Sequence, residues 1–158
     1  MVEKKSSNGK RMVPTLAFVL AIFLILVTVS LFSYFGYQSV IYLLAKMFNA
    51  TDNTSTIYDF FIGLVSIVGS VFVFIGSVHV FRLKTSVPKL FVWGSSFFLL
   101  KNVLDIINDI QPLRSLETVS FSDVSEVAWS IGADFLQVAF WIFVVVYFNR
   151  ASFKSMLK

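Results

Sequence analysis

Ionisable and amide side chains interrupt two of the most apolar stretches of this sequence. Lys101, Asn102 and Asp105 fall within the stretch 97–110, and Asp134 and Gln137 fall within the stretch 124–148. Residues three or four positions apart share a face of a helix, so each set would form a polar stripe. Ionisable groups inside a membrane segment can relay protons or ions or line a cavity for a polar substrate. They can also act as a polar latch that fixes how helices pair.

Composition places these stretches in a membrane protein. Of the 158 residues, 57% are hydrophobic and 14% are charged, whereas a soluble domain has about 45–50% apolar and about 25% charged residues. The mean hydropathy of +0.82 points the same way. We therefore interpret the net charge of +4 as basic loops that face anionic lipid, and we expect no nucleic-acid partner.

Four apolar segments predict an all-α fold, a single transmembrane domain over residues 1–158 built as a four-helix bundle. A helix needs about 20 apolar residues to cross a bilayer, and the expected spans are about 13–35, 58–81, 88–110 and 124–148. The segment about 37–49 has apolar residues at helical spacing on one face. This pattern predicts an interfacial helix, either separate or continuing the first span.

The second span carries small residues that would let another helix approach closely. Gly63, Gly69 and Gly76 are candidate positions for close helix packing. We expect this packing to occur within one chain rather than at a homodimer interface. His79 lies near the end of this span beside Arg82. We expect it to be an interfacial residue rather than a ligand.

Lysine and arginine placement predicts the orientation of the chain. Ten basic residues fall on one side: Lys4, Lys5, Lys10, Arg11, Arg82, Lys84, Lys89, Arg150, Lys154 and Lys158. The other side, with the outer halves of the helices included, has only Lys46, Lys101 and Arg114. Because basic loops stay in the cytoplasm, both termini are expected there. An aromatic belt is expected at the outer boundary, from Tyr34, Tyr37, Tyr42 and Tyr58.

The same topology predicts the depth of the polar stripes. Lys101 and Asp134 each lie about nine or ten residues inside the outer end of their spans, which is roughly 14 Å. One unpaired charge near the middle of a bilayer costs on the order of 2.5–3.5 kcal/mol. We therefore expect Lys101, with Asp105, to turn inward toward Asp134 and Gln137. A latch is favoured over a relay because a chain of this size has little room for a pathway, and docking of a partner subunit is a third reading.

Known catalytic patterns are missing from the sequence. It has no cysteine, one histidine, and neither a G-x-S-x-G nor an H-E-x-x-H motif. We therefore expect no catalytic residue, no cofactor and no metal site, and hence a protein that is not an enzyme.

The segment "VFVFIGSVHVFRLKTSVPKLFVWGSSFFLLKNVLDIIND" (71–109) resembles the middle of the bacterial membrane family called domain of unknown function 2569. An apolar helix ends in Phe and basic residues, a short turn leads to a Pro, and Asn and Asp lie near the end of the next helix. The matching positions are Phe81, Arg82, Lys84, Pro88, Lys89, Leu90, Phe91, Asn102 and Asp105. The resemblance implies a four-helix protein of the bacterial inner membrane and implies no activity.

Two functions remain open on the sequence. The first is a non-enzymatic accessory or assembly subunit that acts through helix contacts with another membrane protein or with copies of itself. The second is a small oligomeric transporter or channel that uses Lys101, Asp105 and Asp134.

Overall fold

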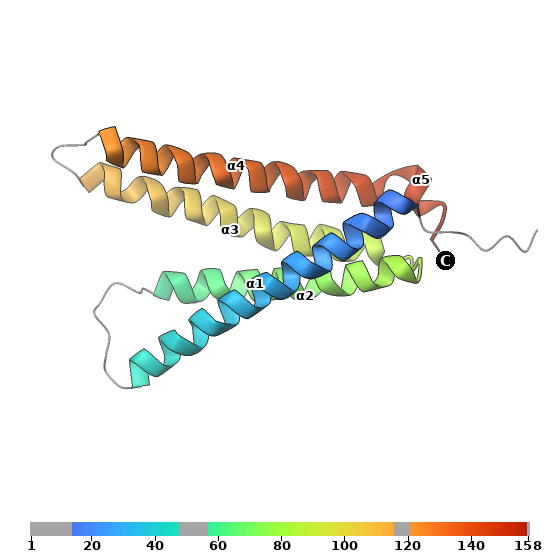
Figure 1. The fold of residues 1–158 in the computed structure, drawn as a ribbon, viewed down its shortest axis with the longest axis horizontal. Helices are drawn as coiled ribbons and strands as arrows, with labels where there is room; N and C mark the ends of the chain where they lie inside the picture. Colours follow the sequence, from blue (N-terminus) through green and yellow to red (C-terminus); the bar gives the residue numbers. More distant parts are fainter. Residues whose placement is uncertain (1–13, 48–56, 116–120, 158) are drawn as a thin grey trace, which may run out of the picture.

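The computed structural model describes residues 14–47, 57–115 and 121–157, and nearly all of them are helical. Its helices are α1 (Thr15–Met47), α2 (Ile57–Phe81), α3 (Val87–Ser115), α4 (Phe121–Asn149) and the short α5 (Ala151–Lys154) (Figure 1). Four of them contain stretches long and apolar enough to cross a bilayer: Thr15–Leu44, Phe60–Phe81, Val87–Asn108 and Val127–Asn149. The expected all-α architecture with four membrane-crossing helices is confirmed, and the chain is a multi-pass membrane protein.

Helix α1 runs without a break through Gly36. No proline or charged residue occurs between Thr15 and Ala45, and one glycine costs a helix only about 1 kcal/mol. Pro14 precedes the helix, and its carbonyl accepts the amide of Phe18 at 3.0 Å. The segment expected as an interfacial helix therefore belongs to α1 as far as Met47, and positions 48–49 lie outside the described residues.

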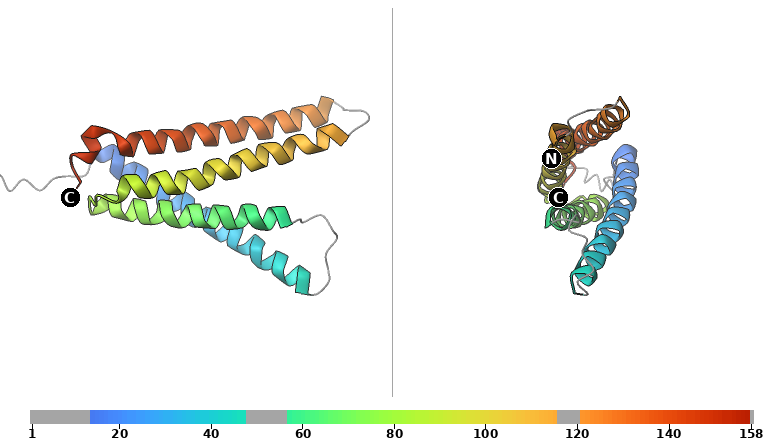
Figure 2. Two further views of the ribbon diagram at one scale, coloured as in Figure 1. Left: turned by 180° about the vertical axis from the view of Figure 1, so that it is seen from behind. Right: turned by 90° about the vertical axis from the view of Figure 1, so that its left-hand side faces the viewer.

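Neighbouring helices in the sequence pack against one another, α1 on α2, α2 on α3 and α3 on α4. Figures 1 and 2 show α1 running obliquely across α2, and the α1–α2 pair diverging from the α3–α4 pair toward one end. We call this the open end; it holds Met47 and Ser115. The opposite, closed end holds the α2–α3 turn, α5 and the start of α1, where Phe18 packs edge-on against Phe81 at 5.2 Å.

Aromatic rings fill the bundle toward the closed end. Phe91 stacks on Phe148 with ring centroids 4.2 Å apart, and Phe98 stacks on Trp141 at 4.3 Å. Phe153 of α5 meets Phe148 edge-on at 5.0 Å. All five rings are buried. Lipid tails are as apolar as these side chains, so close packing rather than exclusion of water holds membrane helices together.

The turn between α2 and α3 is tightly specified. The amide of Lys84 donates to the carbonyl of His79 at 3.2 Å and the amide of Leu83 to Val80 at 3.0 Å, the two bonds of a Schellman motif. Leu83 adopts the left-handed conformation, φ 49°, where glycine is usual. A side chain there costs roughly 1–2 kcal/mol, and burial of Leu83 offsets that cost. His79 is held by Ser86, whose Oγ lies 2.9 Å from His79 Nδ1.

Glycines bring α2 and α3 into backbone contact. A Cβ atom at Gly69 would lie 3.1 Å from Phe97 Cβ and 3.3 Å from the carbonyl of Gly94, and one at Gly76 would lie 3.3 Å from Leu90 Cβ. A Cβ atom at Gly63 would instead meet α1, 3.2 Å from Ser39 Oγ. The three glycines singled out in the sequence therefore all lie at contacts within the chain.

Candidate functional site

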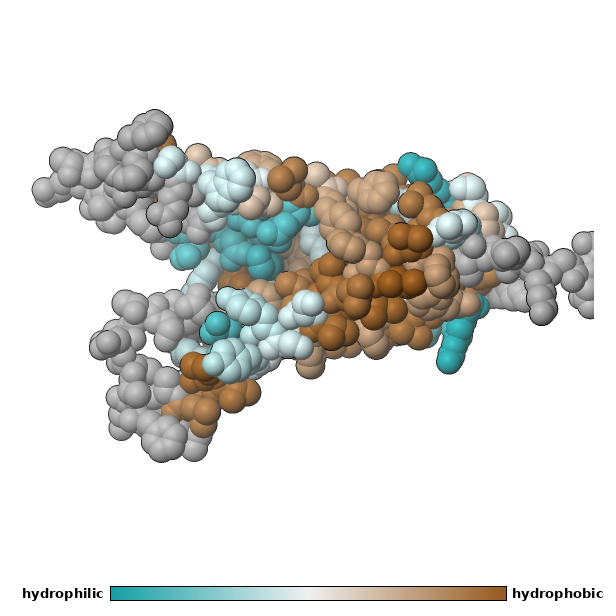
Figure 3. Space-filling model, in the orientation of Figure 1, coloured by the Kyte–Doolittle hydropathy of each residue, from teal (hydrophilic) through white to brown (hydrophobic). Residues whose placement is uncertain are grey.

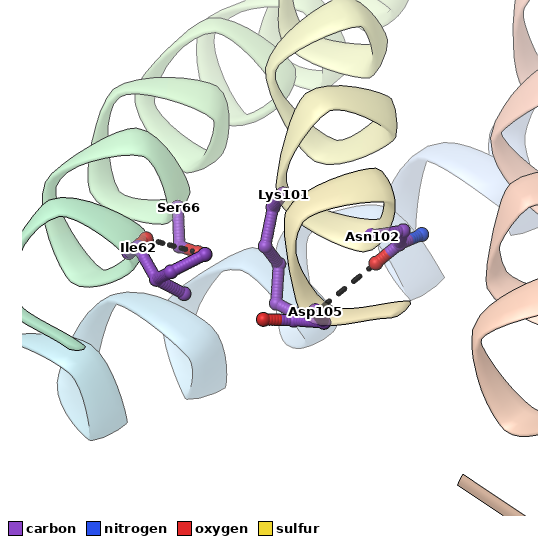
Figure 4. Close-up of polar contacts among 5 residues, drawn as sticks. All are labelled: Ile62, Ser66, Lys101, Asn102 and Asp105. Atoms are coloured by element: carbon purple, nitrogen blue, oxygen red, sulfur yellow. Dashed lines mark hydrogen bonds and ion pairs between the residues drawn. The ribbon is translucent and has the colours of Figure 1, made fainter. Parts of the chain in front are cut away.

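The polar groups of α3 cluster where the two helix pairs begin to separate. Lys101 forms an ion pair with Asp105, one turn nearer the open end, and its Nζ also donates to Asn102 Oδ1 at 3.4 Å (Figure 4). Figure 4 shows Lys101 and Asp105 along one side of α3, with Asn102 projecting from the other. The charged side chains are largely enclosed, 13% exposed for Lys101 and 23% for Asp105.

The ion pair that the structure shows for Lys101 is with Asp105 on its own helix. The pairing expected between Lys101 and Asp134 across the α3–α4 interface stays a prediction. An acid four residues away lies within reach of a lysine without any constraint on how two helices are rotated. Asp134 is nevertheless buried in α4, at 6% exposure, in keeping with an inward orientation.

Gln137 and Lys101 do come together, at a cavity between α1, α3 and α4. The cavity measures about 420 Å³, and we call it the α1–α4 groove. Its polar lining groups come from Tyr34, Lys101 and Gln137, and its apolar walls are Phe23, Val27, Leu31, Phe35, Phe98, Phe140 and Trp141.

One aromatic contact joins α1 and α4 in the groove wall. Phe23 of α1 meets Phe140 of α4 edge-on at 5.9 Å. Figure 3 shows a hollow between the two helix pairs at the open end, with hydrophilic atoms gathered on its α3–α4 side. The open end therefore presents a polar hollow between the two helix pairs.

Asn102 is the most constrained polar residue of the cluster. It is fully buried, and its amide nitrogen has no hydrogen-bond partner among the residues that the structure describes. A buried donor without a partner costs about 1–3 kcal/mol. Proteins keep such a buried donor where it binds a ligand or where it fixes how helices pack.

The polar cluster is suited to charge pairing and hydrogen bonding. The ion pair has no net charge, so it lowers the cost of placing Lys101 and Asp105 within the membrane. The groove offers the ammonium group of Lys101, the side-chain amide of Gln137 and the phenol of Tyr34 for hydrogen bonding. Within the described ranges, no group of three or more His, Asp or Glu residues is placed to hold a metal ion.

Sequence reasoning missed two features of the site. It treated Tyr34 only as part of an aromatic belt, whereas the ring lines the groove. It also overlooked Gly94 of α3, which faces Gly69 and Val73 of α2. A glycine within an apolar helix was an available signal, since glycine there usually marks close approach of another helix.

Comparisons with protein-family models, with curated proteins and with solved structures found no match to this chain. Its function is therefore argued from the groove and the polar cluster themselves.

Proposed function

We propose that this protein is a non-enzymatic accessory or assembly subunit that receives a transmembrane helix of a partner membrane protein in the α1–α4 groove. The observation that carries the proposal is the groove itself. It is largely apolar, runs beside α1 from Phe23 to Phe35, and brings Lys101 and Gln137 to its wall. The twelve steps from Phe23 to Phe35 correspond to roughly 18 Å along α1, a little over three helical turns.

The composition of the groove suits a helix with one polar residue. Its aromatic and aliphatic walls offer shape for close packing, which is the main source of affinity between helices in lipid. A carboxylate or amide on the partner could bond Lys101 or Gln137, a contact worth about 0.6–2 kcal/mol between membrane helices. We expect the partner to carry such a residue at the depth of Lys101.

A small oligomeric transporter or channel is the second candidate, and the hollow at the open end favours it. That hollow, with hydrophilic atoms on its α3–α4 side, offers an entry for a polar substrate from one end of the bundle. Toward the other side, the stacked pairs Phe98–Trp141 and Phe91–Phe148 occupy the space between α3 and α4. A pathway in one chain would therefore be open at one end and blocked by aromatic rings at the other. Transport would require several copies of the chain or a rearrangement of its helices.

Site-specific photocrosslinking tests the accessory role in native membranes. A photoreactive phenylalanine at Leu31, in the groove wall, is expected to form one discrete adduct with a partner protein. The same residue at Leu26 on α1, 63% exposed and outside the groove lining, should give only lipid adducts. Gln137→Leu should reduce the Leu31 adduct several-fold, because it removes a polar group from the wall.

Two results would contradict a heteromeric accessory role. A Leu31 adduct of twice the monomer mass would show that copies of this chain fill the groove. A flux that depends on pH through the purified, reconstituted protein, together with an oligomeric state above two, would establish the transport function. An adduct at Leu31 unaffected by Gln137→Leu would remove the polar contact from the proposal.

We further infer that the closed end faces the cytoplasm of a bacterial cell, as the resemblance to an inner-membrane family implies. Support comes from five basic residues that the structure gathers at this end: Arg82, Lys84, Lys89, Arg150 and Lys154. Cytoplasmic segments of membrane proteins are enriched in lysine and arginine.

Single introduced cysteines test this orientation against a native background that has none. Probes at Ser115 and at Asn53, the latter outside the described residues, are expected to react with an impermeant reagent in intact cells. Probes at Ser155 and at Ser7, also outside the described residues, should react only after permeabilisation. Labelling of Ser155 in sealed cells would reverse the orientation or change the number of spans.

A further inference from the structure

A second pocket lies at the closed end, away from the polar cluster. It measures about 450 Å³ and sits where the start of α3, the end of α4 and α5 meet. Its lining residues are Thr85, Pro88, Lys89, Val92, Trp93, Asn149, Lys154 and Leu157. Two lysines from different helices thus line one pocket, and none of its lining residues is acidic.

The pocket coincides with the boundary of the bilayer. The third apolar span begins at Val87 and the fourth ends at Asn149. Lys89 and Lys154 therefore lie close to this boundary, at headgroup depth. Trp93 lies six residues into the third span, about 9 Å deeper, and it is 60% exposed. The pocket is thus basic at its rim and apolar on its membrane side.

Other polar groups near the pocket already have contacts within the chain, so Lys89 and Lys154 are the groups that would bind a ligand. The amide of Asn149 donates to the carbonyl of Val145 at 2.9 Å, and the guanidinium of Arg150 lies 5.7 Å from the ring centre of Tyr147. At the start of α3, the backbone amide of Val87 donates to the carbonyl of Lys84 and that of Leu90 donates to the carbonyl of Ser86. Pro88 has no amide hydrogen. The binding charge therefore comes from side chains rather than from the helix terminus.

We propose that this pocket binds the phosphate group of an anionic phospholipid. Lys89 and Lys154 contact the phosphate, the hydroxyl of Thr85 supplies a hydrogen bond, and an acyl chain lies along Val92 and Trp93. Basic pockets between helices at a membrane surface suit such headgroups, since each basic residue near the surface adds attraction to anionic lipid. This assignment is independent of the function proposed for the groove.

Native mass spectrometry of the purified full chain with added phosphatidylglycerol or phosphatidylcholine tests the proposal. The wild type is expected to retain phosphatidylglycerol preferentially. The double variant Lys89→Gln, Lys154→Gln should weaken that retention roughly tenfold to thirtyfold, the combined effect of two basic residues beside an anionic headgroup. The matched control is Arg82→Gln, Lys84→Gln, which removes two exposed charges from the same end without touching the pocket lining.

Three outcomes would overturn the assignment. Equal weakening by both double variants would mean a diffuse field of positive charge rather than a site. Unchanged retention in Lys89→Gln, Lys154→Gln would exclude these lysines. In a separate arm with inorganic phosphate in neutral detergent, thermal protection equal to that given by phosphatidylglycerol would show that the pocket takes free phosphate and not a lipid.

Discussion

Gly94→Ala is expected to lower the free energy of unfolding by about 1–3 kcal/mol, the usual cost of overpacking. A Cβ atom at Gly94 would lie 2.5 Å from Val73 Cγ2 and 3.1 Å from both the carbonyl oxygen of Gly69 and the amide nitrogen of Val73. Two of these three neighbours are backbone atoms, so α2 and α3 would have to move apart. Unfolding in mild detergent, followed by helical circular dichroism, measures the effect.

Gly132→Ala is the matched control. This position is also a glycine within a long helix, and a Cβ atom there would have nothing within 4 Å. Both changes gain about 1 kcal/mol of helix propensity, so Gly132→Ala should be neutral or stabilising. Equal stability of the two variants would mean that α2 and α3 do not approach as closely as described. Gly69→Leu and Gly76→Leu should fall on the destabilised side for the same reason.

Lys101→Met and Asp105→Asn are each expected to be costly alone and to be strongly non-additive together. Removing one partner leaves the other charge in a largely enclosed place. In soluble proteins breaking a buried pair costs about 3–5 kcal/mol, and the hollow at the open end should reduce that cost by admitting water. A double-mutant cycle on unfolding free energy should give a coupling of about 1 kcal/mol or more.

The cycle between Lys101 and Asp134 provides the comparison. Its coupling should be the smaller of the two, because the ion pair of Lys101 is with Asp105. A larger coupling to Asp134 would restore the pairing across α3 and α4. The double variant of Lys101 and Asp134 also separates two roles for these residues. If they form a latch, the double variant should keep both stability and partner binding. If they form a proton relay, it should regain stability and remain inactive.

The sequence was sufficient for the helices and insufficient for their rotation about their own axes. Long apolar runs, with a proline before the first and basic residues between the second and third, predict four helices whose expected starts lie within three residues of the observed ones. The ends were predicted less well, since α1 continues to Met47 and α3 to Ser115, past the expected ends at about 35 and 110. The run from Thr15 to Ala45 contains nothing that breaks a helix, so the continuation through Gly36 could also be read from it. Which acid Lys101 meets depends on side-chain reach and helix rotation, and a period of 3.6 residues leaves Asp105 and Asp134 both accessible.

The groove could not be predicted from the sequence. Its walls come from three helices, and Phe23, Lys101 and Gln137 share no pattern that would associate them. Their proximity depends on the crossing of α1 over α2, which depends in turn on residues such as Gly63 and Ser39 at their contact. Helix-packing angles arise from how particular side chains interdigitate, and a linear pattern does not encode them.

The long apolar span of α1 would couple this protein to the thickness of its membrane. The apolar span of α1 has 30 residues, whereas the other three have 22 or 23. These lengths correspond to roughly 45 Å and roughly 33–35 Å, against a hydrocarbon core of about 30 Å. A helix with this excess accommodates hydrophobic mismatch by tilting, and the oblique path of α1 across α2 in Figure 1 is consistent with such a tilt. A thinner bilayer would demand more tilt, and a change in the angle of α1 would alter the groove that it lines, so lipid composition would influence partner binding.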